Sequence, residues 1–546
     1  MSANAESFEQ IIDSLATGTR LVTRLSLATP PAALTHIQKM LDSLRAHPPG
    51  RDIYLDVLEQ LRPPLHAAMK ELVPLCRDKP LPLIDRSEAI FLQITETLRK
   101  MHHGYGDCAQ FIKGAPHGNK DAEFTRSLAL TLYRGLYYAS LFVCEHYYAR
   151  QALPPGAWQE VHHYYAEAEQ RDLADKQVMD TLEGEQAATN CTNLYVALLL
   201  VDITNPYSYD VRDQLLIRHW ATLWASHVSI FPVESVLEIP PFIIDLEQDK
   251  PLHPASNSMA SDNARHLDTF GLTAQISETH EMLKHKSVDP AQLKPLNLGD
   301  TSTGHACRLL TRLSAPWGLS ASPRRFRRHS AEHGQARLCS SFEHIHRAVS
   351  GEEFRQPGAF GTPGLSPLGS LRQNFDTVDA IAATGRWRPP QTSTFPTSVW
   401  NIVNYSANGF RLARPLSGQQ VAHGQLVALS QNGSPHYLLG EVRWLMQDTN
   451  EDCLHMGVTM FPGVPQAGAV RPEDLLQGAG EPYLRILLLP GFETTKTPPT
   501  LVLPVGMYRS QRSLSLAQGD SIQRVILEKL WQRGLDFEIV SYKSYK

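Results

Sequence analysis

The chain has 546 residues, which is too long for one hydrophobic core and predicts about three domains of roughly 150 residues each. Apolar residues make up 42% of the sequence and charged residues 20%, which is typical of a globular protein. The formal net charge of -5 excludes a global positive field that would attract nucleic acid or an anionic membrane, so any basic site has to be local.

Targeting signals, apolar runs and cysteine usage together indicate the compartment in which the protein is located. The amino terminus lacks the basic segment and apolar core of a secretory signal, and no stretch offers 18 uncharged apolar residues. The longest apolar run, residues 193–201, stops at Asp202 and has the length of a buried helix. Seven cysteines without CxxC spacing indicate free structural thiols in a reducing compartment. We expect a cytoplasmic protein with no membrane span.

The first 230 or so residues show apolar side chains at helical spacing. One stripe includes Ile53, Val57 and Leu61 and is predicted to end at Pro63-Pro64. Further helices are predicted for residues 128–150, for the residues that follow Trp158, and for residues 193–204. The spacing after Trp158 resembles the first helix of a tetratricopeptide repeat, but no 34-residue period recurs. The helical half is therefore predicted to be either an irregular bundle or a helical-hairpin solenoid.

Two segments have looser patterns. Residues 251–322 mix Pro, Ser, His and Asp with short apolar runs, and we interpret them as a linker region with some helix. Residues 351–396 are rich in Gly, Pro, Ser and Thr, which indicates a long mobile loop inserted into a domain.

After residue 397 the pattern changes to short strands separated by Gly and turn residues, which is typical of a small antiparallel barrel. Residues 335–345 are predicted to supply the first strand of this barrel, before the insertion. The last 80 or so residues predict strands at 483–489, 500–504 and 537–540, and a helix at 521–532.

Two separated motifs stand out in this β-rich part. Residues 324–328 read Arg-Arg-Phe-Arg-Arg, and residues 404–409 read Asn-Tyr-Ser-Ala-Asn-Gly. Arginine offers a planar, permanently charged fork for phosphates and guanine edges. Asn and Ser at a strand end offer small polar contacts, and the following Gly permits close approach of the backbone. The pair predicts an anion-binding clamp suited to a nucleotide.

These residues resemble PilZ domains, the bacterial receptors for cyclic di-GMP. Arg324 and Arg328 fit the RxxxR pattern of the family, and Asn404, Ser406 and Gly409 fit [D/N]xSxxG. Two later runs, 440–444 (GEVRW) and 456–461 (MGVTMF), are similar to the following barrel strands of the family. The resemblance covers about a quarter of the chain.

The resemblance implies a role for each motif. Arg324 and Arg328 would pair with phosphate oxygens and guanine edges of cyclic di-GMP, and Arg325 would add charge or reach. Asn404 and Ser406 would bind a guanine edge, while Gly409 would keep a Cβ away from the ligand.

The distance between the two motifs departs from the family, in which they lie a few tens of residues apart. The insertion at residues 351–396 accounts for the gap. An alternative is that Arg386 and Arg388, which lie nearer Asn404, take over the arginine role. Their RxR spacing does not match the family, so Arg324 and Arg328 are preferred.

Other functional patterns give little support for catalysis or metal binding. The histidine pairs at 102–103 and 162–163, and His344 with His346 on one face of a predicted strand, occur without HExxH or CxxC and are interpreted as packing or surface groups. No nucleophile elbow, phosphate-binding loop, dinucleotide fingerprint or kinase motif is present, so no enzyme activity, cofactor or metal site is predicted.

The predicted fold class is α+β, with a helical amino-terminal half, then a small antiparallel PilZ-like barrel and a further β-rich segment. The expected domains are a helical partner-binding domain (1–250), the linker region (251–322), the barrel (323–468) and a β-rich subdomain (469–546). The predicted function is a cyclic di-GMP receptor that signals to an unidentified protein partner through its helical half. Two alternatives stay open: an adaptor whose barrel binds no ligand, and nucleic-acid binding through the arginines, which the weak net charge disfavours.

Overall fold

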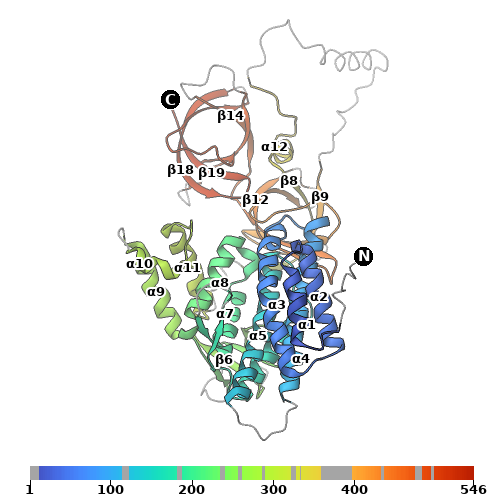
Figure 1. Cartoon of the computed structure of the whole chain (residues 1–546). Coiled ribbons are helices and arrows are strands. Elements are labelled where there is room, and N and C mark those ends of the chain that lie inside the picture. The colour runs from blue at the N-terminus through green and yellow to red at the C-terminus, as the bar shows by residue number, and fades with distance from the viewer. Residues whose placement is uncertain are drawn as a thin grey trace, which may run out of the picture. The chain divides into compact units, whose positions relative to one another are not determined.

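The computed structural model divides the chain into two compact units (Figure 1). Unit 1 comprises Met1–Arg325 and Trp444–Leu454, and unit 2 comprises Phe326–Arg443 and His455–Lys546. The α+β class is confirmed: a helical amino-terminal half precedes antiparallel β-barrels. The structure describes residues 11–113, 122–180, 182, 187–233, 240–255, 261–285, 289–320, 327–331, 334–357, 396–431, 434, 436–473, 482–492, 497–519 and 521–545.

Unit 1 is a helical bundle. Its helices are α1 (Leu15–Leu25), α2 (Pro30–Ala46), α3 (Arg51–Leu72), α4 (Asp85–Lys113), α5 (Ala122–Tyr148), α6 (Ala157–Gln170), α7 (Cys191–Ile203), α8 (Val211–Trp224), α9 (Phe270–Lys284), α10 (Pro290–Leu293) and α11 (Thr303–Trp317). Helix α4 packs against α2, α3 and α5, and α7 packs against α5, α6 and α8. Helices in a solenoid contact only neighbouring repeats, so this pattern favours the bundle over the solenoid. Almost every residue of α5 from Leu128 to Tyr148 is buried, which makes α5 the central helix.

The helical stripe of Ile53, Val57 and Leu61 was predicted to end at Pro63-Pro64, and this is wrong because α3 continues through both prolines. A proline removes one backbone donor and crowds the preceding turn. The buried stripe nevertheless extends on both sides of the prolines, from Leu61 to Leu65. Tertiary packing of this apolar face therefore outweighs the local preference to stop.

A charged network joins α3, α5 and the strand β1 (Val178–Asp180) inside unit 1. Asp180 accepts hydrogen bonds from Arg62 and Arg134, each at 2.8 Å. Glu59 accepts from the same two arginines at 3.1 and 3.2 Å, and from the hydroxyl of Tyr105 at 2.6 Å. Because each buried guanidinium faces two carboxylates, the network compensates the cost of burying its charges.

Residues 251–322 differ from the predicted linker, since they supply packed elements to unit 1. A four-stranded sheet has the order β3-β6-β4-β5, and α9 packs against α11, which also contacts α7. The strands of this unit are β2 (Ala187–Thr189), β3 (Ser229–Pro232), β4 (Phe242–Asp245), β5 (His253–Pro254) and β6 (Ala264–Asp268). Trp317 at the end of α11 is fully buried and donates to the carbonyl of Leu200 at 2.9 Å. Composition alone therefore did not predict the packed helices of this segment, whose apolar residues occupy one face.

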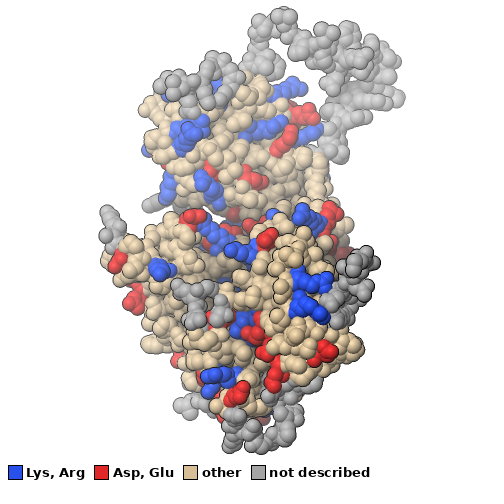
Figure 2. Space-filling view, viewed as in Figure 1, with Lys and Arg blue, Asp and Glu red and all other residues tan. Residues whose placement is uncertain are grey.

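The apolar run at 193–201 lies in α7 and is buried within unit 1, as its length predicted. Among the described residues, no helix is both long enough and apolar enough to cross a membrane. All seven cysteines are free, and five of them are buried. Basic and acidic side chains are interspersed on the face shown in Figure 2, in keeping with the small net charge.

Unit 2 forms two barrels, except that residues 444–454 of the first barrel are assigned to unit 1. The first has the strand order β10-β13-β12-β11-β8-β9, and pairing of β9 with β10 closes the ring. Its strands are β7 (His329–Ser330), β8 (Gln335–Ser340), β9 (Ser398–Ser406), β10 (Gly409–Pro415), β11 (Leu426–Gln431), β12 (Leu438–Asp448) and β13 (Cys453–Met460). The short strand β7 precedes β8 and pairs with the other end of β9. The predicted small antiparallel barrel after residue 397 is therefore present.

The carboxy-terminal segment forms a second closed barrel with the order β14-β15-β16-β19-β18-β17. Its strands are β14 (Gln466–Pro472), β15 (Leu484–Leu489), β16 (Thr500–Pro504), β17 (Ser513–Gln518), β18 (Ser521–Arg533) and β19 (Phe537–Ser544). All neighbouring strands are antiparallel. Closure removes every unpaired strand edge from this small domain.

The predicted helix at 521–532 is wrong, because these residues form β18. The register of β18 against β19 shifts between Leu527 and Leu530, and again between Leu530 and Gln532. Such bulges interrupt the two-residue alternation of a strand. Leu530 follows buried Leu527 at a spacing of three residues, which is the spacing of an apolar helical face. The sequence pattern therefore indicated a helix.

The helix α12 (Phe342–Ser350) links the cores of the two barrels in unit 2. Ile345 on this helix is fully buried with Leu426 and Leu439 of the first barrel and with Leu487 and Phe537 of the second. The predicted strand over 335–345 is thus half wrong, since β8 ends at Ser340 and a capped helix follows. His344 and His346 accordingly lie on a helix instead of one face of a strand. His344 is half-buried, and buried His346 contacts the carbonyl of Gly468 at 3.2 Å.

The shared core predicts that a cavity in α12 weakens both barrels together. Replacing Ile345 with Ala should lower the free energy of unfolding of unit 2 by about 2–5 kcal/mol, because a fully buried aliphatic side chain is removed. Hydrogen exchange of the full chain should become faster in β8 and in β15. The matched control is Ile522→Ala, which truncates an isoleucine that is 54% exposed and should leave exchange unchanged. Faster exchange confined to α12 would contradict a shared core.

Candidate ligand-binding site on the first barrel

The Asn404 motif forms the hairpin between β9 and β10. Ser406 pairs with Gly409, and Ala407 and Asn408 form the loop between them. The Ser406 hydroxyl donates to Asn408 Oδ1 at 2.9 Å, and the backbone amide of Met460 donates to the Asn408 carbonyl at 2.9 Å. The hairpin tip is therefore fixed against the end of β13.

Gly409 is required by close packing of the backbone. A Cβ at this position would lie 2.4 Å from the carbonyl oxygen of Val458 on β13. The expected reason for this glycine was clearance for a ligand. The neighbouring strand supplies a sufficient physical reason by itself, because no side chain fits there.

A β-bulge sets the direction of Asn404. The register between β9 and β10 shifts between Arg411 and Leu412, so that Leu412 pairs with Ile402 and Arg411 pairs with Asn404. Leu412 and Ile402 are buried in the barrel, and successive residues of β10 point to opposite faces. Arg411, and with it Asn404, therefore lies on the outer face of the barrel. The extra residue on β9 is Val403, which is exposed.

The arginine segment leads into β7, which pairs with β9 beside the motif. His329 pairs with Tyr405 and Ser330 pairs with Asn404. Arg328 precedes this pair directly and is exposed, as is Arg327. Arg328 is therefore the residue directly before a strand that pairs with the Asn404 strand. Most of the insertion, residues 358–395, lies outside the described residues. Arg324, Arg325, Arg386 and Arg388 lie outside the described residues.

Cross-strand pairing places Ser330, Asn404 and Arg411 in one row on the outer face. Ser406 lies two residues after Asn404 and so shares its face. Asn404 and Ser406 are half-buried. Within the described part of the chain, the side chains of Arg328 and Asn404 form no hydrogen bond or ion pair.

Sequence reasoning missed two members of this row. Ser330 and Arg411 occur in ordinary-looking strand sequence, and neither belongs to a motif. Their positions depend on the β7–β9 register and on the bulge, which have no clear sequence signature. Alternation from buried Leu412 is the one signal that assigns Arg411 to the outer face.

Not every arginine near the motif is free to bind a ligand. Arg414 is only 4% exposed, and its guanidinium carbon lies 4.8 Å from the centre of the Trp400 ring. It donates to the carbonyl of Pro415 at 3.0 Å and to those of Ser417 and Gln419. Arg414 therefore holds the loop after β10 and has a structural role.

The two runs that resemble later PilZ strands lie in β12 and β13. Val442 and Val458 are buried in the barrel. A Cβ on Gly440 would lie 2.7 Å from the Val458 side chain and 2.8 Å from the carbonyl oxygen of Thr459. These residues therefore maintain the close strand packing that positions Gly409, and they are not part of the polar row.

Known proteins give a family context for this architecture. Residues 16–233 match the family model described as "Cyclic-di-GMP receptor FimW, N-terminal domain", and residues 469–545 match "FimW C-terminal beta-barrel domain". These matches indicate a cyclic-di-GMP receptor family. The first barrel, with the polar row, lies between the two matched ranges.

One curated relative is similar over most of its length. It is the "Cyclic-di-GMP receptor FimW" of Pseudomonas aeruginosa, which is 24% identical over 541 residues, covering 90% of this chain and 84% of the relative. No solved structure matches the chain. The relative is named as a receptor and not as an enzyme, which is consistent with the prediction of no enzyme activity.

The close approach at Gly409 yields a direct test. Gly409→Ala should destabilise the first barrel, because the added Cβ would displace the Val458 carbonyl and with it the end of β13. Hydrogen exchange should become faster in β9, β10 and β13. Gly304→Ala adds the same methyl group in α11, where the nearest atom is 3.8 Å away, and should have no such effect. Unchanged exchange around β13 in the Gly409 variant would contradict the packing described here.

Proposed function

We propose that the chain is a cyclic di-GMP receptor that binds its ligand with the polar row on the outer face of the first barrel, as PilZ domains do. The observation that carries the proposal is the pairing of Ser330 with Asn404, since it brings exposed Arg328 beside the Asn404 motif. The receptor names of the matching family models and of the relative support the choice of ligand.

The chemistry of the row suits this ligand. Cyclic di-GMP carries two phosphates and two guanines. Arg328 would make charge-assisted hydrogen bonds to a phosphate or to guanine acceptor atoms. Asn404 and Ser406 would bind a guanine edge, and Arg411 would add positive charge on the same face. Arg324, a few residues upstream, would pair with the phosphates and guanine edges as well, and Arg325 would add positive charge.

Signalling would follow from a difference in affinity between two arrangements of the arginine segment. A ligand shifts such an equilibrium only by its differential affinity, which is typically about 1–3 kcal/mol in allosteric proteins. We propose that this shift changes how the helical half contacts a protein partner.

Calorimetric titration with cyclic di-GMP tests the site. The full chain should give a saturable heat of binding. Arg324→Ala combined with Arg328→Ala should weaken binding by at least about 100-fold, because two charge-assisted bonds of about 1.5–3 kcal/mol each are removed. Asn404→Ala should weaken binding about tenfold. Arg509→Ala removes an exposed arginine of the second barrel and serves as the control.

Three outcomes would contradict the proposal. If the intact chain gives no saturable heat, the receptor proposal is wrong and the alternative of an adaptor whose barrel binds no ligand is favoured. Unchanged affinity in the arginine and Asn404 variants would place the ligand elsewhere. Steeply salt-dependent binding of single-stranded nucleic acid that free cyclic di-GMP does not displace would favour nucleic-acid binding by the arginines.

A further inference from the structure

A second cluster of chemically active side chains lies in unit 1, on α4 and α6. It consists of His102, His103 and Glu160, whose donor atoms all lie within 4.8 Å of one another. The cluster is built entirely from described residues of unit 1, so it is independent of the proposed cyclic di-GMP site. Sequence analysis found no metal motif here, because Glu160 is 57 residues away from His103 in the chain.

Tyr164 fixes the distance between the two helices. Its hydroxyl donates to the backbone carbonyl of His102 at 2.6 Å. A Cβ on Gly106 would lie 2.9 Å from the Tyr164 hydroxyl, and a Cβ on Gly135 would lie 2.3 Å from its ring. Both glycines therefore make room for this tyrosine. Glu160 lies one helical turn before Tyr164 on α6, so the anchored tyrosine brings the carboxylate to the histidines.

The donor atoms converge on the Glu160 carboxylate. His103 Nε2 lies 3.0 Å from Glu160 Oε1, and His102 Nε2 lies 3.2 Å from Glu160 Oε2. The two imidazole rings are 4.4 Å apart at an angle of 71°. Each histidine thus offers its Nε2 atom to the same small region of space.

Hydrogen bonds within the described residues do not fully satisfy this cluster. His102 is 1% exposed, yet neither of its ring nitrogens has a partner in hydrogen-bond geometry. The contact of its Nε2 atom with Glu160 has a suitable distance but unsuitable angles. Buried polar atoms are normally paired, so an unpaired buried imidazole that points at a carboxylate and a second imidazole indicates a missing partner.

The donor set and its spacing suit zinc. Two imidazoles and one carboxylate form the protein ligand set of an open tetrahedral zinc site. Bonds of about 2.0–2.1 Å place the ligands of a tetrahedral zinc ion about 3.3 Å apart. The three donor atoms here lie within 4.8 Å of one another, so small side-chain rotations would bring them to that spacing. Soft metals that prefer thiolates are disfavoured, since this set contains no sulfur.

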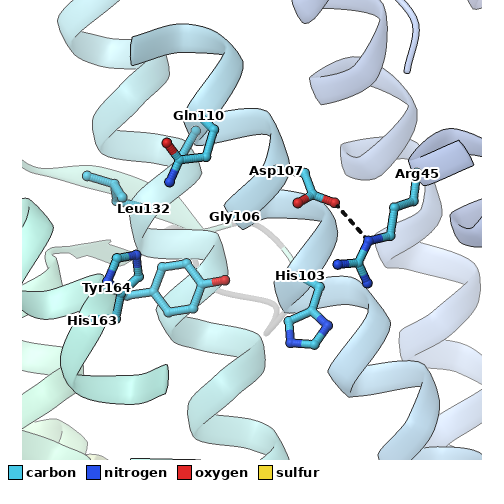
Figure 3. Close-up of a pocket in the computed structure, with 9 residues that line it drawn as sticks. Arg45, His103, Gly106, Asp107, Gln110, Leu132, His163 and Tyr164 are labelled. Atoms are coloured by element: carbon cyan, nitrogen blue, oxygen red, sulfur yellow. Dashed lines mark ion pairs between the residues drawn. The ribbon is translucent and has the colours of Figure 1, made fainter. Parts of the chain in front are cut away.

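A cavity borders the cluster on the side of His103. It has a volume of about 150 Å³, and His103, Asp107, His163 and Tyr164 are among its lining residues (Figure 3). Asp107 is paired with Arg45 at 3.5 Å at the side of the cavity (Figure 3). Such a space holds water, which completes the coordination of many zinc ions.

We propose that His102, His103 and Glu160 bind one divalent zinc ion per chain, with water as the fourth ligand. The ion would tie α4 to α6 and would stabilise the helical bundle by mass action, since the site does not exist in the unfolded chain.

The test uses the full chain after removal of metal with a chelator. Titration with zinc in competition with a chromophoric chelator should give one site per chain. His103→Ala should weaken zinc binding at least 100-fold and Glu160→Gln at least tenfold. Both residues are partly exposed, so these variants should fold, and circular dichroism of the metal-free proteins checks this. The matched control is His163→Ala, which removes a histidine of the same cavity outside the donor set and should bind zinc normally.

Cobalt distinguishes this site from the free cysteines. Cobalt bound here should show tetrahedral visible absorption without a thiolate charge-transfer band. Three results would overturn the proposal: no binding at one ion per chain, affinity unchanged in both folded variants, or thiolate absorption in the cobalt protein. Each would mean that the cluster is a buried ion pair only. None of them would affect cyclic di-GMP binding, which the titration of the barrel variants tests separately.

Discussion

The two-residue pairing of β7 with β9 is the contact on which the candidate site depends. Ser330 and His329 pair with Asn404 and Tyr405, although more than seventy residues of chain lie between them. Without this pairing, the arginine segment would have no defined position relative to the barrel. With it, Arg328 lies beside a row of outward polar groups. A single irregularity, the bulge at Val403, turns Asn404 outward, while Trp400 and Ile402 before it are buried in the core.

The rest of unit 2 holds this edge of the barrel in place. Gly409 and Gly440 permit β13 to pack closely against its neighbours, and no larger residue fits at either position. The Arg414 guanidinium donates to loop carbonyls and lies over the Trp400 ring, so it stiffens the barrel and does not compete for a ligand. Ile345 joins the cores of both barrels. A binding site is expected to have a rigid framework around a small exposed polar surface, because its side chains then lose little conformational freedom when the ligand binds.

The sequence predicted features that depend on local pattern and missed those that depend on register. Helical periodicity correctly predicted a helical amino-terminal half, and short strand patterns separated by Gly correctly predicted the first barrel. The Asn404 motif lies where a strand ends, as predicted. The helix expected at 521–532 is a strand because its bulges disturb the alternation. Helix α3 passes through Pro63 and Pro64 because its buried face outweighs them. Arg411 and Glu160 join their clusters only through tertiary packing, which no local pattern encodes.

Hydrogen exchange of the full chain, with and without saturating cyclic di-GMP, tests most directly whether the paired segments form the binding site. We expect slower exchange in residues 327–330 and 398–411 when the ligand is bound, because the arginine segment closes on β9 and their hydrogen bonds open less often. Saturated binding that leaves exchange in both segments unchanged, and that slows exchange elsewhere, would contradict the central claim that the ligand lies on the outer face of β7, β9 and β10.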